Sequence, residues 1–273
     1  YETGKHHLDF SNAHKASFFE YFQEVTDQKA AGSKSNHSIW VSTLKHLRQF
    51  HKLPDLTFEE VDQLFLEGFR HYLMHKARTK SATPLSRNTQ SAYFNKLRAA
   101  LNQAEQERLL PDNPVRRVKA IQGEKNKRVY LTEDEVRALA QAECRYDVLK
   151  RAFLFSCCTG LRWSDIHQLT WAELEPFYGH YRIVFIQKKT SGLQYLDLND
   201  MAMQLMGSSG KTSERIFKGL KYSAWHNMEL TRWALQAGIT KKVTFHSARH
   251  SFAVIQLNRG AEINALSRSP GHS

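Results

Sequence analysis

The sequence has few cysteines and no long apolar run. Its three cysteines are too few for a disulfide framework, and Cys157 and Cys158 lie side by side in an apolar segment, where buried free thiols are usual. No apolar stretch approaches the length that spans a membrane, and the N-terminal residues show no secretory signal pattern. We therefore expect a cytoplasmic protein that works under reducing conditions and has no membrane partner.

Several catalytic signatures are also missing. The sequence contains no Walker phosphate-binding loop and no paired-carboxylate metal site, and it shows neither an internal repeat nor a low-complexity segment. These absences fit a chemistry that requires neither ATP nor a bound metal, such as the one implied by the resemblance described below. We expect no cofactor.

Positive charge, in contrast, is abundant. The net charge is +12, with 18 Lys+Arg against 13 Asp+Glu in residues 1–120 and 21 against 14 in residues 121–273. The chain is long enough for two domains. An excess of basic residues in both halves fits a polyanion that contacts both, most simply nucleic acid. Mere solubility is the alternative, because many basic proteins bind nothing acidic.

Helical periodicity dominates the first 112 residues. Apolar stripes predict helices around Phe18–Val25, Trp40–Leu47, Val61–Leu73 and Tyr93–Ala104. The stretch Thr57-Phe-Glu-Glu60 is a capping box, which predicts that the third helix begins there. Helices this closely connected predict a small bundle, and we expect residues 1–112 to form one domain.

Two of these helices begin in polar, basic segments, Gly32–Asn36 and Leu85–Gln90. Helix N-termini present N–H groups and the positive end of the helix dipole, which makes phosphate binding plausible at both. Ordinary capping by serine and asparagine is the alternative. Together with the fourth helix and the segment that follows the bundle, they supply the candidate DNA contacts, which are Lys34, Ser35, Arg87, Asn88, Thr89, Lys96, Lys127 and Arg128.

A segment typical of a linker follows the bundle. Residues 113–128 combine proline, glycine and basic residues, which predicts an exposed connection that lies along a phosphate backbone. A second domain of residues 129–273 opens with a capping box between Thr132 and Glu135. Residues 181–186 and 193–198 predict a β-hairpin among further helices. The predicted fold is mainly α with a small β-sheet, a helical domain followed by a mixed α+β domain.

The segment His246-Ser-Ala-Arg-His250 can be interpreted as a metal site or as an anion site. His246 and His250 are spaced to bind zinc from one helix face, but Ser247 stands where zinc proteases carry glutamate, and no third ligand is near in sequence. We therefore expect no metal. His246 and Arg249 also share one helix face and suit a phosphodiester, because arginine donates two parallel hydrogen bonds to phosphate and histidine carries a proton.

Four motifs give the chain a specific resemblance. In order, they are TGLRWSD at Thr159–Asp165, KKT at Lys188–Thr190, HSAR at His246–Arg249 and GH at Gly271–His272. This ordered set resembles that of the tyrosine recombinases, the phage-integrase family. The helical bundle resembles the family's core-binding domain, so the likeness covers nearly the whole chain. In style the motifs are similar to integrases of mobile elements in Bacteroides-like bacteria, which implies a bacterial, DNA-associated protein.

The resemblance implies catalytic roles for Arg162, Lys189, His246, Arg249 and His272. The two arginines are expected to clamp the scissile phosphate and stabilise its transition state. Lys189 is expected to protonate the leaving 5′-oxygen, with Lys188 as its rival. His246 then assists proton transfer and His272 hydrogen-bonds the phosphate. Asp165 and His250 are expected to have structural roles.

The implied activity is site-specific cutting and rejoining of duplex DNA through a 3′-phosphotyrosine intermediate, which integrates or excises a mobile element. The implied partners are recombination-site DNA, further copies of the chain in a homotetramer on synapsed DNA, and a DNA-bending host factor. The three alternatives are a DNA-binding protein of the same fold without cleavage activity, a chromosome-dimer-resolving recombinase and a type IB topoisomerase. The compact helical bundle disfavours the topoisomerase.

The chain departs from the family pattern near its end. The nucleophilic tyrosine is expected about nine residues after His272 in the family arrangement of the phosphate clamp, and Ser273 is the last residue printed. We expect that the sequence is cut short or lacks a C-terminal segment, and that an N-terminal arm-binding domain could precede Tyr1. Pro270 stands where an apolar helix former is usual, which is a second departure.

Overall fold

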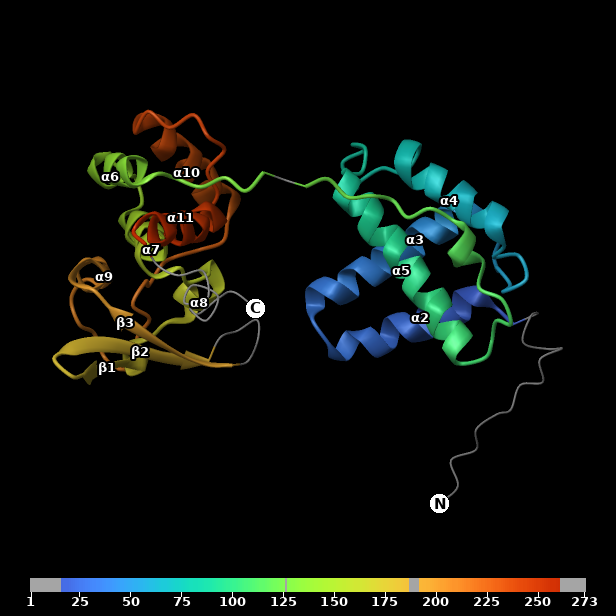
Figure 1. The fold of residues 1–273 in the computed structure, drawn as a ribbon, viewed down its shortest axis with the longest axis horizontal. Coiled ribbons are helices and arrows are strands. Elements are labelled where there is room, and N and C mark those ends of the chain that lie inside the picture. Colours follow the sequence, from blue (N-terminus) through green and yellow to red (C-terminus); the bar gives the residue numbers. More distant parts are fainter. Residues whose placement is uncertain (1–15, 126, 187–191, 261–273) are drawn as a thin grey trace, which may run out of the picture. The chain divides into compact units, whose positions relative to one another are not determined.

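The computed structural model describes residues 16–125, 127–186 and 192–260. The chain divides into two compact units, with the boundary between residues 126 and 127. Each unit has its own hydrophobic core, one built from residues 18–121 and the other from residues 131–248. Figure 1 shows the helices and strands of both units along the chain. The observed fold is mainly helical with one small sheet, which confirms the predicted fold class.

The first unit is a helical bundle. Its helices are α2 (Phe18–Gln28), α3 (Lys34–His51), α4 (Gln63–His75) and α5 (Arg87–Gln106), with short 3-10 turns η1 (Lys29–Ala31) and η2 (Pro114–Arg117). The predicted apolar stripes of α2, α3 and α5 form its centre, and large side chains such as Phe18, Leu47 and Leu97 have no exposed surface. Burial of this stripe, rather than helix propensity, holds each helix in the bundle.

The predicted start of the third helix is wrong. Helix α4 begins at Gln63, where the carboxylate of Asp62 accepts a hydrogen bond from the Phe65 N–H at 2.7 Å. Half of the box at Thr57 forms, since the Glu60 carboxylate accepts from both the N–H and the hydroxyl of Thr57 at 2.8 Å. It closes a turn and not a helix, because Thr57 is held in an isolated bridge to Ser17.

The exposed segment between the units is shorter than the predicted linker of residues 113–128. Val115, Val118 and Ile121 are buried in the core of the first unit. The next residues are also fastened to α5, because Arg87 Nε donates to the Gln122 carbonyl at 3.0 Å and Asn88 Oδ1 accepts from the Glu124 N–H at 2.8 Å. Apolar residues spaced along a basic segment therefore belong to the bundle.

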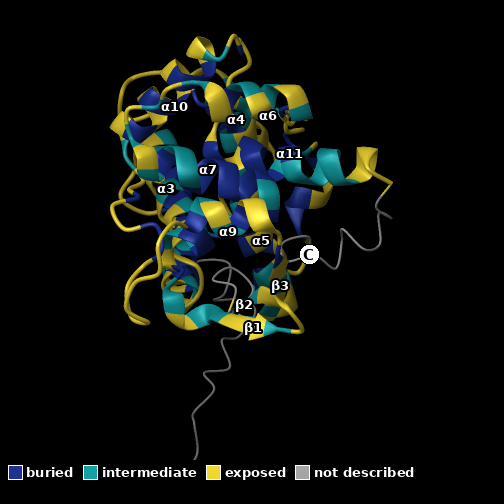
Figure 2. Cartoon of the chain, turned by 90° about the vertical axis from the view of Figure 1, so that its left-hand side faces the viewer, coloured by how far each residue is buried: buried dark blue, intermediate teal, exposed yellow. Residues whose placement is uncertain are grey.

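The second unit is organised around one buried helix. Its elements are α6 (Glu133–Gln141), α7 (Asp147–Thr159), α8 (Trp163–Gln168), η3 (Trp171–Glu173), β1 (Leu174–Phe177), β2 (His180–Ile186), β3 (Leu193–Leu198), α9 (Asp200–Met206), α10 (Ala224–Gln236) and α11 (Phe245–Asn258). Helix α7 packs against both α9 and α11 and is mostly dark blue, meaning buried, in Figure 2. The predicted capping box of Thr132 and Glu135 is confirmed at the start of α6.

The small sheet has the antiparallel order β1-β2-β3. The predicted hairpin corresponds to β2 and β3, in which Tyr181 pairs with Leu198 and Ile186 with Leu193. Strand β1 was not predicted, since helices were expected up to Tyr181, and it contains Pro176. Its place at the edge of the sheet explains why the proline is tolerated there.

No helix within the described part of the chain is both long enough and apolar enough to cross a membrane.

Candidate active site

The TGLR motif forms the turn that ends α7 and begins α8. Gly160 caps the C-terminus of α7 in the left-handed conformation, with φ of 70°. The turn is closed by side chains, since the Thr159 hydroxyl donates to the Phe155 carbonyl at 2.6 Å and the Ser156 hydroxyl donates to the Leu161 carbonyl at 2.8 Å. Arg162 follows at the N-cap of α8, so its backbone position is fixed by the turn.

Gly160 is also needed for a close approach. A Cβ atom built on Gly160 would lie 2.6 Å from Cδ1 of Phe252, which is a residue of α11. Real Cβ contacts are essentially never that short. The glycine therefore lets α11 pack directly against the end of α7.

Arg249 joins these two helices. Its side chain extends from α11, is 5% exposed, and donates from Nη1 to the Gly160 carbonyl oxygen at 2.7 Å. Burial, and to a smaller extent the nearby charge of Arg162, lower the pKa of Arg249 to about 10, while the carboxylate of Asp165 opposes this shift. The guanidinium therefore remains charged at neutral pH, held between a like charge and an opposite one.

The start of α11 directs the histidine of the HSAR motif. Thr244 and Ser247 form a reciprocal capping box, in which the Thr244 N–H donates to the Ser247 hydroxyl at 3.1 Å. His246 lies in this first turn and is exposed, while Ser247 and Arg249 on the same turn are buried. The rings of His246 and His250 meet edge to face, with centroids 4.5 Å apart.

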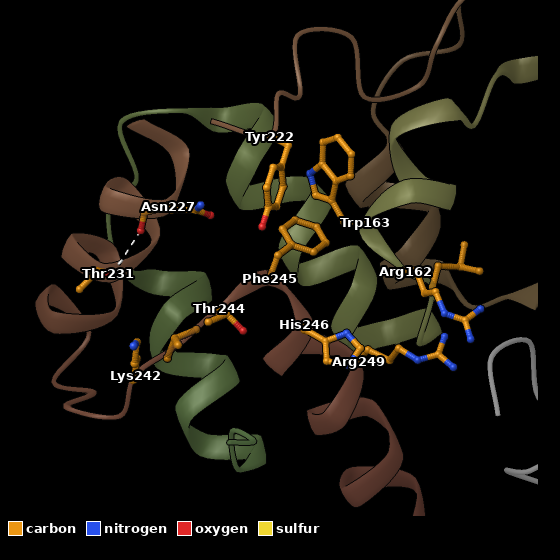
Figure 3. A pocket seen from close by; sticks show the side chains of 12 residues that line it. Arg162, Trp163, Tyr222, Asn227, Thr231, Lys242, Thr244, Phe245, His246 and Arg249 are labelled. Carbon is orange, nitrogen blue, oxygen red and sulfur yellow. Dashed lines mark hydrogen bonds between the residues drawn. The ribbon is translucent and has the colours of Figure 1, made fainter. Parts of the chain in front are cut away.

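These residues surround a cavity of about 520 Å³, which we call the arginine cavity. Figure 3 shows the guanidinium groups of Arg162 and Arg249 extending to the same side of it, with His246 next to Arg249. None of the described lining residues is acidic, and they are Leu161, Arg162, Trp163, Tyr222, Asn227, Thr231, Lys242, Val243, Thr244, Phe245, His246 and Arg249. A cavity with this lining favours an anionic ligand.

The structure brings together three of the five predicted catalytic residues. Arg162, His246 and Arg249 line one cavity although more than 80 residues separate the TGLR turn from α11. Lys189 with its rival Lys188, and His272, lie outside the described residues. Among the described residues, no group of three or more His, Cys, Asp or Glu side chains could hold a metal ion.

Most of the predicted DNA contacts of the first unit lie at helix starts, Lys96 lies in the middle of α5, and several have internal partners. Lys34 and Ser35 are exposed in the first turn of α3, and Thr89 lies in the first turn of α5. Besides the Arg87 and Asn88 contacts described above, Lys96 Nζ donates to Asn36 Oδ1 at 2.6 Å. Its ammonium lies 5.2 Å from the ring centroid of Trp40, and burial lowers its pKa.

Lys127 and Arg128, the other two predicted contacts, are exposed at the start of the second unit.

Sequence reasoning missed a second cavity, whose lining includes several basic residues. It has a volume of about 630 Å³ in the first unit, and we call it the basic cavity. None of its described lining residues is acidic, and they are Ser42, Lys45, His46, Gln49, Tyr72, Lys76, Arg78, Thr79, Lys80, Leu85, Thr89 and Tyr93. The cluster of basic residues from Lys76 to Lys80 was the available signal, but only the fold adds Lys45 of α3 to it.

Comparison with known proteins identifies the family. A family model described as the phage integrase SAM-like domain matches residues 17–121, and one described as the phage integrase family matches residues 129–273. The chain belongs to the phage integrase family. The HSAR and TGLR segments that meet at the arginine cavity thus lie within the family's catalytic region, and the basic cavity lies within its SAM-like domain.

Curated relatives of this integrase-family chain are named as recombinases. A tyrosine recombinase XerC of Pelotomaculum thermopropionicum is 27% identical over 226 residues, covering 75% of this chain and 72% of the relative. A tyrosine recombinase XerD of Shewanella oneidensis is 25% identical over 266 residues, covering 88% and 83%. The resemblance to Bacteroides-type integrases stays a prediction.

Solved structures share the fold. A lambda integrase dimer bound to a COC′ core site matches with a TM-score of 0.72 and 18% identity, covering 94% of this chain and 92% of the other. The Tn1549 transposon integrase in complex with circular intermediate DNA matches with a TM-score of 0.70 and 17% identity over the same shares. The two-unit fold of this integrase-family chain is therefore that of DNA-bound integrases.

The packing at Gly160 generates a stability prediction. Replacing Gly160→Ala forces a left-handed alanine, at about 1–2 kcal/mol, and a clash with Phe252, at about 1–3 kcal/mol for overpacking. We expect the free energy of unfolding in urea to fall by the sum. Gly179→Ala is the matched control, since its φ is 82° and nothing lies within 4 Å of the added Cβ. Equal losses in the two variants would contradict the close approach.

Proposed function

We propose that the protein is a site-specific DNA recombinase that cuts and rejoins duplex DNA through a 3′-phosphotyrosine intermediate, in the integration or excision of a mobile element. The observation that carries this proposal is the arginine cavity. Arg162 and Arg249 belong to two distant motifs and lie on one side of this cavity beside His246, and none of its described lining residues is acidic. Membership of the phage integrase family and the names of the curated relatives support it.

The two guanidinium groups suit the transition state of a reaction at a phosphodiester. Their planar donors match the non-bridging oxygens of a phosphodiester, on which negative charge develops as the nucleophile attacks. Arg249 is held rigidly by the Gly160 carbonyl, so little reorganisation is needed when that charge appears. The mutual repulsion of Arg249 and Arg162 is relieved by the same anion.

The chemistry needs a nucleophile and an acid. A tyrosine phenol gives up its proton and its oxygen bonds to phosphorus, the bond from phosphorus to the 5′-oxygen breaks, and the leaving 5′-oxygen takes up a proton. The reverse step, with a 5′-hydroxyl of another strand, releases the tyrosine. We assign the acid to Lys189, proton assistance to His246 and a hydrogen bond to the phosphate to His272. The bond energy is retained in the intermediate, so the reaction requires neither ATP nor metal.

The proposed partners are DNA and further copies of the chain. One structure of the same fold is described as a lambda integrase tetramer bound to a Holliday junction, with a TM-score of 0.70 to this chain. By analogy we propose a homotetramer on two synapsed recombination sites, with a DNA-bending host factor as a further partner. Chromosome-dimer resolution is the second candidate function, which the XerC and XerD relatives favour.

Removing either arginine tests the phosphate clamp. In a form of the protein that carries the expected tyrosine, Arg249→Ala or Arg162→Ala lowers the rate of covalent adduct formation on the order of 100- to 1,000-fold, because one preorganised donor is lost. DNA affinity changes far less, since many other phosphate contacts remain. The measurement is adduct formation on a nicked suicide substrate in EDTA, resolved on a denaturing gel.

Arg259→Ala is the matched control for this test. Arg259 caps the C-terminus of the same helix, is ion-paired with Glu133 at 2.8 Å, and is largely exposed. Its replacement leaves adduct formation near the unchanged rate. Full activity after Arg249→Ala, or an adduct that requires a divalent metal, rules out the proposed mechanism.

A sulfur substitution distinguishes the two candidate acids. Lys189→Ala slows cleavage of normal DNA, because the leaving 5′-oxygen is no longer protonated. A substrate with a 5′-bridging sulfur restores much of the rate, since a thiolate leaves without a proton. The measurement is single-turnover cleavage of both substrates by each variant. Rescue in Lys188→Ala but not in Lys189→Ala transfers the role to Lys188.

The basic cavity generates a prediction for DNA binding. We propose that it contacts the DNA backbone, so Lys45→Ala weakens binding to all sequences alike and lowers the slope of log affinity against log salt by about 1. Lys52→Ala is the control, because Lys52 caps the same helix outside this cavity. Fluorescence anisotropy over a salt series measures both slopes. Identical slopes in the two variants exclude the basic cavity from the DNA-binding surface.

A further inference from the structure

The arginine cavity has a positive group at each of two sides. Arg162 and Arg249 extend to one side, and Lys242 stands at the other (Figure 3). Asn227 and Thr231 of α10 lie on the Lys242 side, with the Thr231 hydroxyl donating to the Asn227 carbonyl at 3.2 Å. In the proposed function the two arginines bind one phosphate, and this leaves Lys242 without an assigned role.

Lys242 differs sharply from its neighbour in the chain. Lys241 is used inside the second unit, where its Nζ donates to Glu135 Oε2 at 2.7 Å and to the Tyr130 carbonyl at 3.2 Å. It also lies 5.6 Å from the centroid of the Tyr130 ring. Lys242 is exposed and lines the cavity on the side of Thr231 (Figure 3). Lys241 thus contacts residues of its own unit, whereas the adjacent Lys242 lines the arginine cavity.

The cavity is too large for a single phosphate group. Its volume of about 520 Å³ falls within the roughly 300–1,000 Å³ of pockets that enclose drug-sized ligands. Between its two positive sides stand Tyr222, Phe245 and Trp163, whose rings supply an apolar wall (Figure 3). Phosphate, apolar sugar and base surface, and phosphate alternate along a DNA strand in the same way.

We propose that Lys242, assisted by the Asn227 side chain, binds a second phosphate of the strand that is cut. The inference rests on the proposed function and deepens it. The intervening sugar lies against Phe245 and Tyr222, and the strand is held at two points. Lys242 is therefore a positioning residue, which brings the scissile phosphate between Arg162 and Arg249 without contacting the reacting atoms.

This role affects binding more than chemistry. Lys242→Ala raises the Kd for the recombination site and the KM for cleavage roughly tenfold, the size of one charge-assisted contact. The single-turnover rate at saturating DNA changes less than threefold, because the arginine clamp is intact. Lys241→Ala, the matched control, leaves Kd and KM within a factor of about two, since its contacts lie within the unit.

A scan with neutral phosphates locates the contact. Each non-scissile phosphate near the cleavage point is replaced in turn by methylphosphonate, and Kd is measured by anisotropy. For the unsubstituted protein, one position weakens binding roughly tenfold, as Lys242→Ala does. In Lys242→Ala and in Lys242→Gln that position loses its effect, while Lys241→Ala retains it. A matching loss in Asn227→Ala confirms the assisting amide.

The outcomes separate the inference from the function beneath it. If the unsubstituted protein forms an adduct but Lys242→Ala and Lys242→Gln keep its full methylphosphonate profile, the second phosphate site is wrong and the recombinase function stands. If Lys242→Ala lowers the saturated cleavage rate as much as Arg249→Ala, Lys242 acts in chemistry and the positioning role is wrong. If the protein without these substitutions, in the form that carries the expected tyrosine, neither binds nor cleaves DNA, both proposals fail.

Discussion

The hydrogen bond from Arg249 to the Gly160 carbonyl is the contact on which the arginine cavity depends. It places a buried cation at the C-terminal end of α7, where the helix dipole is negative. The same turn positions the backbone of Arg162 two residues later, at the N-cap of α8. Because Gly160 has no side chain, α11 approaches closely enough for the contact to form.

The closeness of Arg162 and Arg249 affects how the arginine cavity binds an anion. Burial and the charge of Arg162 lower the pKa of Arg249, and Asp165 offsets this only in part. An anion between the guanidinium groups adds an opposite charge that counteracts these effects and raises that pKa, so the ligand stabilises the arrangement that binds it. The two arginines stabilise a phosphate more strongly as its negative charge grows. Such a difference between transition state and ground state speeds the reaction and does not merely tighten binding.

Local signals predicted much of this architecture, and long-range contacts were beyond them. Apolar periodicity located α2, α3, α5 and the β2–β3 hairpin, and the short motifs selected Arg162, His246 and Arg249. The capping-box pattern at Thr57 predicted the wrong helix start, because Thr57 forms an isolated β-bridge with Ser17. The bond from Arg249 to Gly160 spans 89 residues, and nothing in either segment alone indicates it.

Positive charge alone does not show where an anion binds, since much of it is used internally. Arg116, Arg117, Arg137, Arg151 and Lys241 each contact a carboxylate within the chain. The two cavities differ from these sites because no described residue that lines either is acidic. Their clustered cations repel one another until an outside anion enters. Each unit thus has its own cavity without acidic residues among its described lining, which fits the proposed DNA partner.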